Sequence, residues 1–243
     1  MRKESLDVIY VKKMGRVVIQ DNYLSDIHVH SAIKRWFLYE GLIEYKYAYI
    51  GDVDIFIVQE EIPLLEQHKI HLHTLGLPYS NIVRDDNFNM LTGLHFIETK
   101  PYFKAMCPII LKYKNKTNFP EHRDHGDEKV LFDMIKESDL KLPLFIKYNV
   151  PGFVSVVNFT DPTKVLFRPD HGVHFALFRD NDDPNYFINV SSLEQPPYIK
   201  YLKRMYLMIQ DPIFKIIRRN FKDEFIIKIF ENVEKYIKDK KLM

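Results

Sequence analysis

Apolar and polar positions along this chain follow two alternating periods. Short β-branched and aromatic runs are typical of strands, and apolar spacings of three and four are typical of helices. Strands are predicted at 7–11, 16–20, 47–58 and 91–97, and within 143–157 and 165–178. Helices are predicted at 27–44, 62–71, 127–138 and, in two pieces broken near Asp211-Pro212, from 198 to the end, and 101–111 is predicted to be a helix or a mixed segment. Strands alternating with helices predict an α/β fold.

The run at 47–58 is the most informative of these strands. It is apolar except at Gly51, Asp52 and Asp54, so it predicts a buried central strand interrupted by carboxylates. Buried charges must be paired or must bind a metal ion. Side chains two positions apart on a strand point the same way, so Asp52 and Asp54 are expected to form an oxygen site for Mg²⁺ or Mn²⁺. The alternative is a strand end whose acids are solvated.

Composition narrows the class of protein. The 243 residues, 46% of them hydrophobic, fit one domain or one domain with a helical appendage. The net charge of +2 argues against nucleic acid as a partner. A single cysteine, Cys107, excludes an internal disulfide and suits a reducing compartment. Because no apolar run approaches the ~18 residues of a membrane span and the N-terminus is unlike a signal peptide, we expect a cytoplasmic protein.

The segment 46–57, Lys-Tyr-Ala-Tyr-Ile-Gly-Asp-Val-Asp-Ile-Phe-Ile, resembles the D-x-D strand of glycosyltransferases with the GT-A fold. Three later motifs resemble that fold in their order: a small-residue-Gly strand at 91–96, an acidic helix start at 127–131 and the late His/Gly motif of glycosyltransferase family 8 and its relatives at 171–174. The resemblance covers 27–179. It implies a GT-A-like (Rossmann-like) mixed central sheet flanked by helices over 1–197, with a helical extension packed on it over 198–243.

The same resemblance implies a metal-dependent transfer from a UDP- or GDP-sugar to a glycan or lipid-linked acceptor. The residues expected to bind Mn²⁺ or Mg²⁺ are Asp52, Asp54 and His171. Those expected on the donor side are Asp21, Tyr23, Asp52, Arg84, Arg168 and His174. Those expected on the acceptor side are Thr92, Gly93 and His95, with Asp127 or Glu128 contacting the acceptor or acting as general base. Structural roles remain the alternative, such as a strand bulge at Gly93 or acids placed at a helix start by its dipole.

Two other functions compete with this interpretation. Polymerase-β-type nucleotidyltransferases also place D-x-D after a strand, although Gly41-Leu42 stands here, without Ser, where their Gly-Ser turn is expected. A sugar-binding module without enzymatic activity is the other.

Basic residues are concentrated near the C-terminus. Residues 200–243 carry 12 Lys and Arg against 6 Asp and Glu, with apolar residues at helical spacing. One interpretation is a packed helix with a solvated basic face, and the other is peripheral contact with an anionic membrane. The His-rich run at 67–73 has no carboxylate or cysteine at ligand spacing, so it is predicted to lie at the surface.

Overall fold

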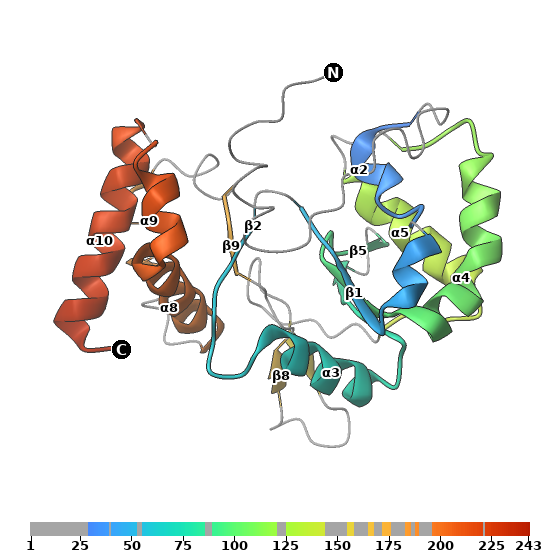
Figure 1. Ribbon diagram of the computed structural model, residues 1–243, viewed down its shortest axis with the longest axis horizontal. Coiled ribbons are helices and arrows are strands. Elements are labelled where there is room, and N and C mark those ends of the chain that lie inside the picture. Colours follow the sequence, from blue (N-terminus) through green and yellow to red (C-terminus); the bar gives the residue numbers. More distant parts are fainter. Residues whose placement is uncertain are drawn as a thin grey trace.

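The chain is a mixed α/β protein in the computed structural model, which confirms the predicted fold class at this level. The described residues are 29–38, 40–52, 55–85, 89–120, 125–143, 155–157, 165–167, 172–175, 183–185, 188–189, 196–220 and 222–243. Helices and small antiparallel strand groups form two adjoining parts, each with its own hydrophobic core (Figure 1).

The first part contains a three-stranded antiparallel sheet. Strand β6 (His95–Glu98) is in the middle, between β1 (Tyr47–Ile50) and β3 (Tyr79–Ser80). The register pairs Ile50 with His95, so the residues that follow β1 lie next to those that precede β6. This antiparallel pairing brings Asp52 toward the turn at 92–94.

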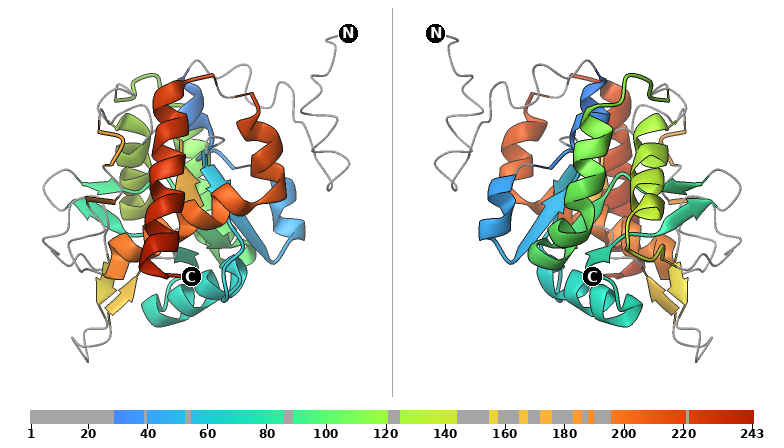
Figure 2. Two further views of the ribbon diagram at one scale, coloured as in Figure 1. Left: turned by 90° about the vertical axis from the view of Figure 1, so that its left-hand side faces the viewer. Right: turned by 90° about the vertical axis from the view of Figure 1, so that its right-hand side faces the viewer.

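Helices pack around this sheet (Figures 1 and 2): α2 (Ser31–Lys34), η1 (Glu40–Glu44), α3 (Leu64–Leu75), α4 (Thr99–Lys114) and α5 (Gly126–Glu137). Helix α5 matches its predicted range, and its apolar residues Val130, Leu131, Met134 and Ile135 recur at helical spacing and are buried. They belong to the same core as Trp36 and Phe37 from the segment after α2.

The second part joins a strand pair to the C-terminal helices. Strand β2 (Ile55–Ile57) pairs with β9 (Gly172–His174), and α8 (Pro196–Gln210), α9 (Pro212–Arg218) and α10 (Glu224–Lys240) lie beside them (Figure 1). The buried Val58 and Val173 belong to the core of these helices. Two further antiparallel pairs are β4 (Val83–Asp85) with β5 (Met90–Leu91), and β7 (Ser155–Val157) with β8 (Val165–Phe167).

The predicted strand at 47–58 is divided at its carboxylates. Its first half, β1, is an edge of the described three-stranded sheet, and its second half, β2, pairs with a different partner. The predicted interruption at the carboxylates is therefore present, but the two halves of the run belong to different sheets. Charged residues that need solvent or a partner interrupt the ladder, and each apolar half pairs with another segment of the chain.

Two predicted helices also differ from the structure. The helix expected over 27–44 is reduced to α2 and η1, and the segment between them carries the buried residues Trp36, Phe37 and Leu38. At the C-terminus the break at Asp211-Pro212 is confirmed, but a second break at 219–223 separates α9 from α10.

The His-rich run is helical, as predicted for 62–71, but it does not lie at the surface. It forms part of α3, where His68 and His71 are buried and place their Nδ1 atoms 2.8 and 2.7 Å from the Ser80 hydroxyl. A spacing of three puts them on one helix face, and only His73 of the three is exposed.

The two strands predicted nearest the N-terminus have no described counterpart. The strands predicted at 7–11 and 16–20 lie outside the described residues. Among the helices that are described, none is both long and apolar enough to cross a membrane.

Candidate functional site

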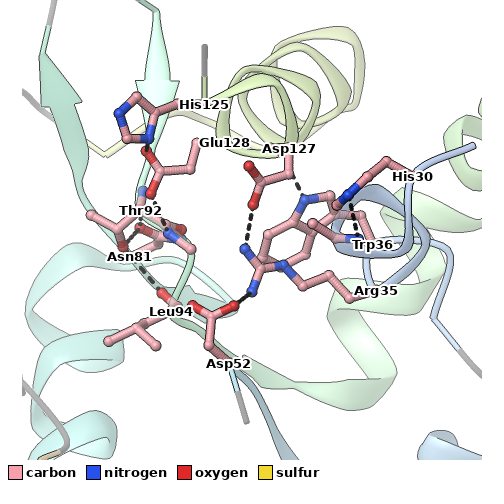
Figure 3. A network of polar contacts seen from close by, with 12 residues as sticks. His30, Arg35, Trp36, Asp52, Asn81, Thr92, Leu94, His125, Asp127 and Glu128 are labelled. Carbon is pink, nitrogen blue, oxygen red and sulfur yellow. Dashed lines mark hydrogen bonds and ion pairs between the residues drawn. The ribbon is translucent and has the colours of Figure 1, made fainter. Parts of the chain in front are cut away.

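Arg35 is the centre of a charged cluster built from distant parts of the chain. It lies at the C-terminal end of α2, and its side chain is only 15% exposed. One terminal nitrogen, Nη1, donates to Asp52 Oδ1, and the other, Nη2, donates to Asp127 Oδ2 (Figure 3). The guanidinium carbon lies 4.5 Å from the ring centroid of Trp36. A planar cation with two donor groups can join two carboxylates in this way.

Asp127 and Glu128 begin helix α5, where the positive end of the helix dipole stabilises carboxylates. The side chain of Asp127 is 6% exposed, and its backbone oxygen accepts a 2.8 Å hydrogen bond from Trp36 Nε1. Arg35 and Trp36 therefore fix this acid at both its side chain and its main chain. Asp127 is suited to holding Arg35 in place.

Glu128 has a different set of contacts. Its Oε1 accepts a 3.0 Å hydrogen bond from the backbone N–H of Gly93, and its Oε2 lies 3.7 Å from Nδ1 of His125. The imidazole of His125 is 55% exposed, whereas the side chain of Glu128 is only 11% exposed. His125 has a φ of 53°, a left-handed conformation that is uncommon for residues other than glycine.

Gly93 lies between the charged side chains. A Cβ atom at this position would be 2.9 Å from Arg35 Nη2, 3.5 Å from Asp52 Oδ2 and 3.6 Å from Glu128 Oε1. The missing side chain is thus what allows the turn at 92–94 to approach the cluster. In the structure Gly93 lies in the connection between β5 and β6, outside either strand.

The side chain of Asn81 hydrogen-bonds to the turn at 92–94. Its Oδ1 accepts hydrogen bonds from the N–H and hydroxyl of Thr92 at 3.1 and 2.7 Å and from the N–H of Ile82 at 2.6 Å. Its Nδ2 donates to the backbone carbonyl oxygen of Thr92 at 3.0 Å and lies 2.9 Å from Nδ1 of His95. Asn81 is fully buried, and its hydrogen bonds offset the cost of that burial.

The predicted acceptor residues Thr92 and His95 are both buried in this arrangement. His95 is 1% exposed, and its ring packs against Trp36, Tyr79 and Tyr102 with centroids 5.2 to 6.0 Å apart. Thr92 and His95 are therefore buried close to Gly93, and through their contacts with Asn81 they support the turn at 92–94.

Several predicted site residues are not described. Asp21, Tyr23, Asp54, Arg168 and His171 lie outside the described residues, and for Arg84 and His174 only the backbone is described, in β4 and β9. Within the described part of the chain, no group of three His, Cys, Asp or Glu residues is placed to hold a metal ion.

The predicted residues that the structure brings together are Asp52, Gly93, Asp127 and Glu128. Arg35 and Asn81 were missed by the sequence interpretation. Arg35 precedes the core residue Trp36 in a predicted amphipathic helix, which is a weak signal for a buried cation. Asn81 stands in a turn-like Pro-Tyr-Ser-Asn stretch that carries no catalytic motif.

Compared with known proteins, this chain matches no family model, no curated protein and no solved structure.

Proposed function

We propose that this protein is a metal-dependent glycosyltransferase of the GT-A type that uses a nucleotide-diphosphate sugar as donor. The observation that carries the proposal is the convergence of Asp52, Gly93 and Glu128 around Arg35. The carboxylates of Asp52, Asp127 and Glu128 outnumber the one guanidinium in this cluster. Such an excess of negative charge suits a divalent cation, and carboxylates with a fixed guanidinium are well suited to binding sugar hydroxyls.

The metal ion of this proposal would be Mn²⁺ or Mg²⁺ on Asp52, Asp54 and His171. The donor set fits, because carboxylate oxygen is the preferred ligand of these ions and Asp52, with its side chain 36% exposed, is the most accessible acid of the cluster. When bound, the ion supplies charge neutralisation to the departing nucleoside diphosphate. Arg35 holds Asp52 in one orientation for this role.

The strand register supports placing the late His motif beside the D-x-D segment. His174 is the Cα partner of Ile55, which directly follows Asp54, whereas Gly172 is the partner of Ile57. The backbone of His174 is thus at the carboxylate end of β2. We therefore propose His174, together with His171, as an imidazole on the donor and metal side.

The acceptor would approach Glu128. This acid accepts the N–H of the buried Gly93 at its Oε1, and its Oε2 lies 3.7 Å from Nδ1 of His125, the exposed residue on that side. In an inverting reaction Glu128 would accept the proton of the acceptor hydroxyl, and in a retaining one it would orient that hydroxyl. Asp127, held by Arg35, positions the cluster without contacting the acceptor.

The test is a thermal-shift panel of UDP-, GDP- and CMP-sugars with and without Mn²⁺, followed by turnover measurements. A donor at a hundred times its Kd is expected to stabilise the fold by about 2.7 kcal/mol. Asp52→Asn should abolish the metal-dependent shift. Glu128→Gln keeps an oxygen for the Gly93 N–H, so it should retain donor binding and lose about 10²-fold or more in turnover. Glu231→Gln, an exposed acid on α10, is the matched control.

Two results would contradict the proposal. One is a donor shift that needs no metal and survives Asp52→Asn. The other is incorporation of label from a nucleoside triphosphate, which would support the nucleotidyltransferase instead.

A further inference from the structure

Helix α9 buries the aromatic side chain of Phe214 in the core of the C-terminal helices. Asp211 caps the helix by accepting hydrogen bonds from the N–H groups of Ile213 and Phe214 at 2.7 and 3.3 Å, and Pro212 follows at the first position. Phe214 is fully buried, with its ring 5.4 Å from Phe56 and 5.3 Å from Phe230. The buried face of this short helix is thereby defined.

The outer face of α9 is apolar where solvent would favour polar residues. At about 100° per residue, Ile216 is roughly opposite Phe214. Ile216 is 47% exposed and its neighbour Ile217 is 39% exposed. Helix α9 lies beside α10, on the side of the molecule away from the β1–β6–β3 sheet (Figures 1 and 2). These two exposed isoleucines, adjacent in the sequence, form an apolar patch on α9.

Basic residues surround the patch. The segment 212–222 contains Lys215, Arg218, Arg219 and Lys222 and no acidic residue. Lys215, Arg219 and Lys222 are exposed, and the guanidinium carbon of Arg218 lies 5.5 Å from the centroid of the Phe230 ring. Residues 212–222 therefore carry four cations, with acids flanking them at 211, 223 and 224.

Two of the neighbouring acids cap helices, whereas Glu224 is exposed close to Lys222 and Glu234 of α10 interacts electrostatically with Arg218. Asp211 caps α9, and Asp223 caps α10 by accepting from the N–H groups of Phe225 and Ile226 at 2.9 and 3.4 Å. Both carboxylates are engaged by helix N-termini, which themselves carry partial positive charge.

We propose that α9 and the residues that follow it, up to Lys222, bind the surface of an anionic membrane. Ile216 and Ile217 would insert among the lipid headgroups, and Lys215, Arg219 and Lys222 would lie beside lipid phosphates. A combination of exposed aliphatic residues and cations fits a lipid surface, where apolar burial and electrostatic attraction add. A nucleic acid would gain from the cations but not from the isoleucines.

The experiment is sedimentation of the full chain with vesicles of phosphatidylcholine alone and of phosphatidylcholine mixed with phosphatidylglycerol. Binding is expected only with the anionic lipid. Lys215→Gln, Arg219→Gln and Lys222→Gln in combination should weaken binding about 100-fold. Ile216→Ser with Ile217→Ser should weaken it about 10-fold. The control combines Lys100→Gln, Lys104→Gln and Lys141→Gln, which removes the same charge from exposed positions elsewhere and should change binding less than about 2-fold. Circular dichroism and melting temperature establish that each variant is folded.

Each other outcome overturns the proposal: no binding to anionic vesicles, equal binding to neutral ones, or an equal loss in the control. Binding of a DNA duplex that is insensitive to the isoleucine changes would assign the surface to nucleic acid instead. A dimer in solution that dissociates on Ile216→Ser would assign it to a second copy of the chain. The vesicle experiment requires no enzymatic activity, so its result is independent of the proposed glycosyl transfer.

Discussion

Arg35 and Asp127 form an ion pair across 92 positions of the sequence, and the same guanidinium binds Asp52, 17 positions away. One side chain therefore fixes the relative position of the segment after β1 and the start of α5. Because both acids are proposed site residues, the stability of this contact and the function of the site should depend on the same atoms.

Arg35→Lys is expected to lower the free energy of unfolding by about 2 kcal/mol and to weaken donor binding about 10-fold or more. A lysine keeps the charge but cannot present two separate nitrogens to two carboxylates. Urea denaturation and calorimetric titration of the donor measure the two effects. Arg219→Lys, at an exposed position, is the matched control and should change neither. If Arg35→Lys behaves like this control, the bridging role is wrong.

Gly93→Ala should impair ligand binding more than it impairs the fold. The added Cβ would lie 2.9 Å from the Arg35 guanidinium, in the middle of the cluster, and would force the charged side chains apart. We expect a loss of about 10-fold or more in donor affinity or turnover. Gly76→Ala is the comparison, because Gly76 has a φ of 63° and open space around it. That change should cost about 1 kcal/mol of stability and leave ligand binding intact.

Asn81→Asp tests the buried hydrogen bonds under the 92–94 turn. Aspartate has almost the same shape but no N–H donor. The backbone carbonyl oxygen of Thr92 and the ring of His95 would therefore lose the amide of Asn81 as a partner. A destabilisation of about 3 kcal/mol is expected, since a charge would also be buried. Thermal or urea unfolding measures it. A wild-type melting temperature for Asn81→Asp would show that the amide does not hold the turn.

The sequence identified the acids of this cluster more readily than the architecture that brings them together. Asp127 and Glu128 were found because a helix start with acids and a clear apolar face is a local pattern, and α5 follows that pattern. Asp52 was found because a charge is conspicuous in an apolar run. The division of that run into β1 and β2 depends on β6 and β9 as partners, and pairing between distant strands leaves no local signal.

Arg35 and Asn81 illustrate the same limit at the level of single residues. Arg35 acquires its role from an acid 92 positions away, and Asn81 from a turn whose position is set by the β3–β6 pairing. His68 and His71 were misassigned to the surface because burial of a polar face of α3 depends on Ser80, which supplies a hydrogen-bonding partner.

Alkaline pH should destabilise the fold through two buried tyrosines. Burial raises the pKa of Tyr102 and of Tyr79 well above the ordinary value. The unfolded chain releases these protons above about pH 10 while the folded state retains them, so stability is fully present below that pH and falls as pH rises beyond it. Each such tyrosine contributes a slope of up to about 1.4 kcal/mol per pH unit.

Melting temperatures between neutral pH and about pH 11 would measure this slope. Tyr102→Phe should reduce it, whereas Tyr45→Phe, at a position 49% exposed, should not. An identical slope in both variants would exclude Tyr102 as a source of the alkaline instability.

The C-terminal helices share their core with the strand pair that follows Asp52. Val58 and Val173 are buried among residues of α8 and α10, and Arg204 of α8 forms an ion pair with Glu60, just beyond β2. A chain ended at 197 would expose both valines and leave Glu60 without this arginine. The helices are therefore not an interchangeable module: replacing them with the C-terminal helices of another protein would require matching changes in β2 and β9.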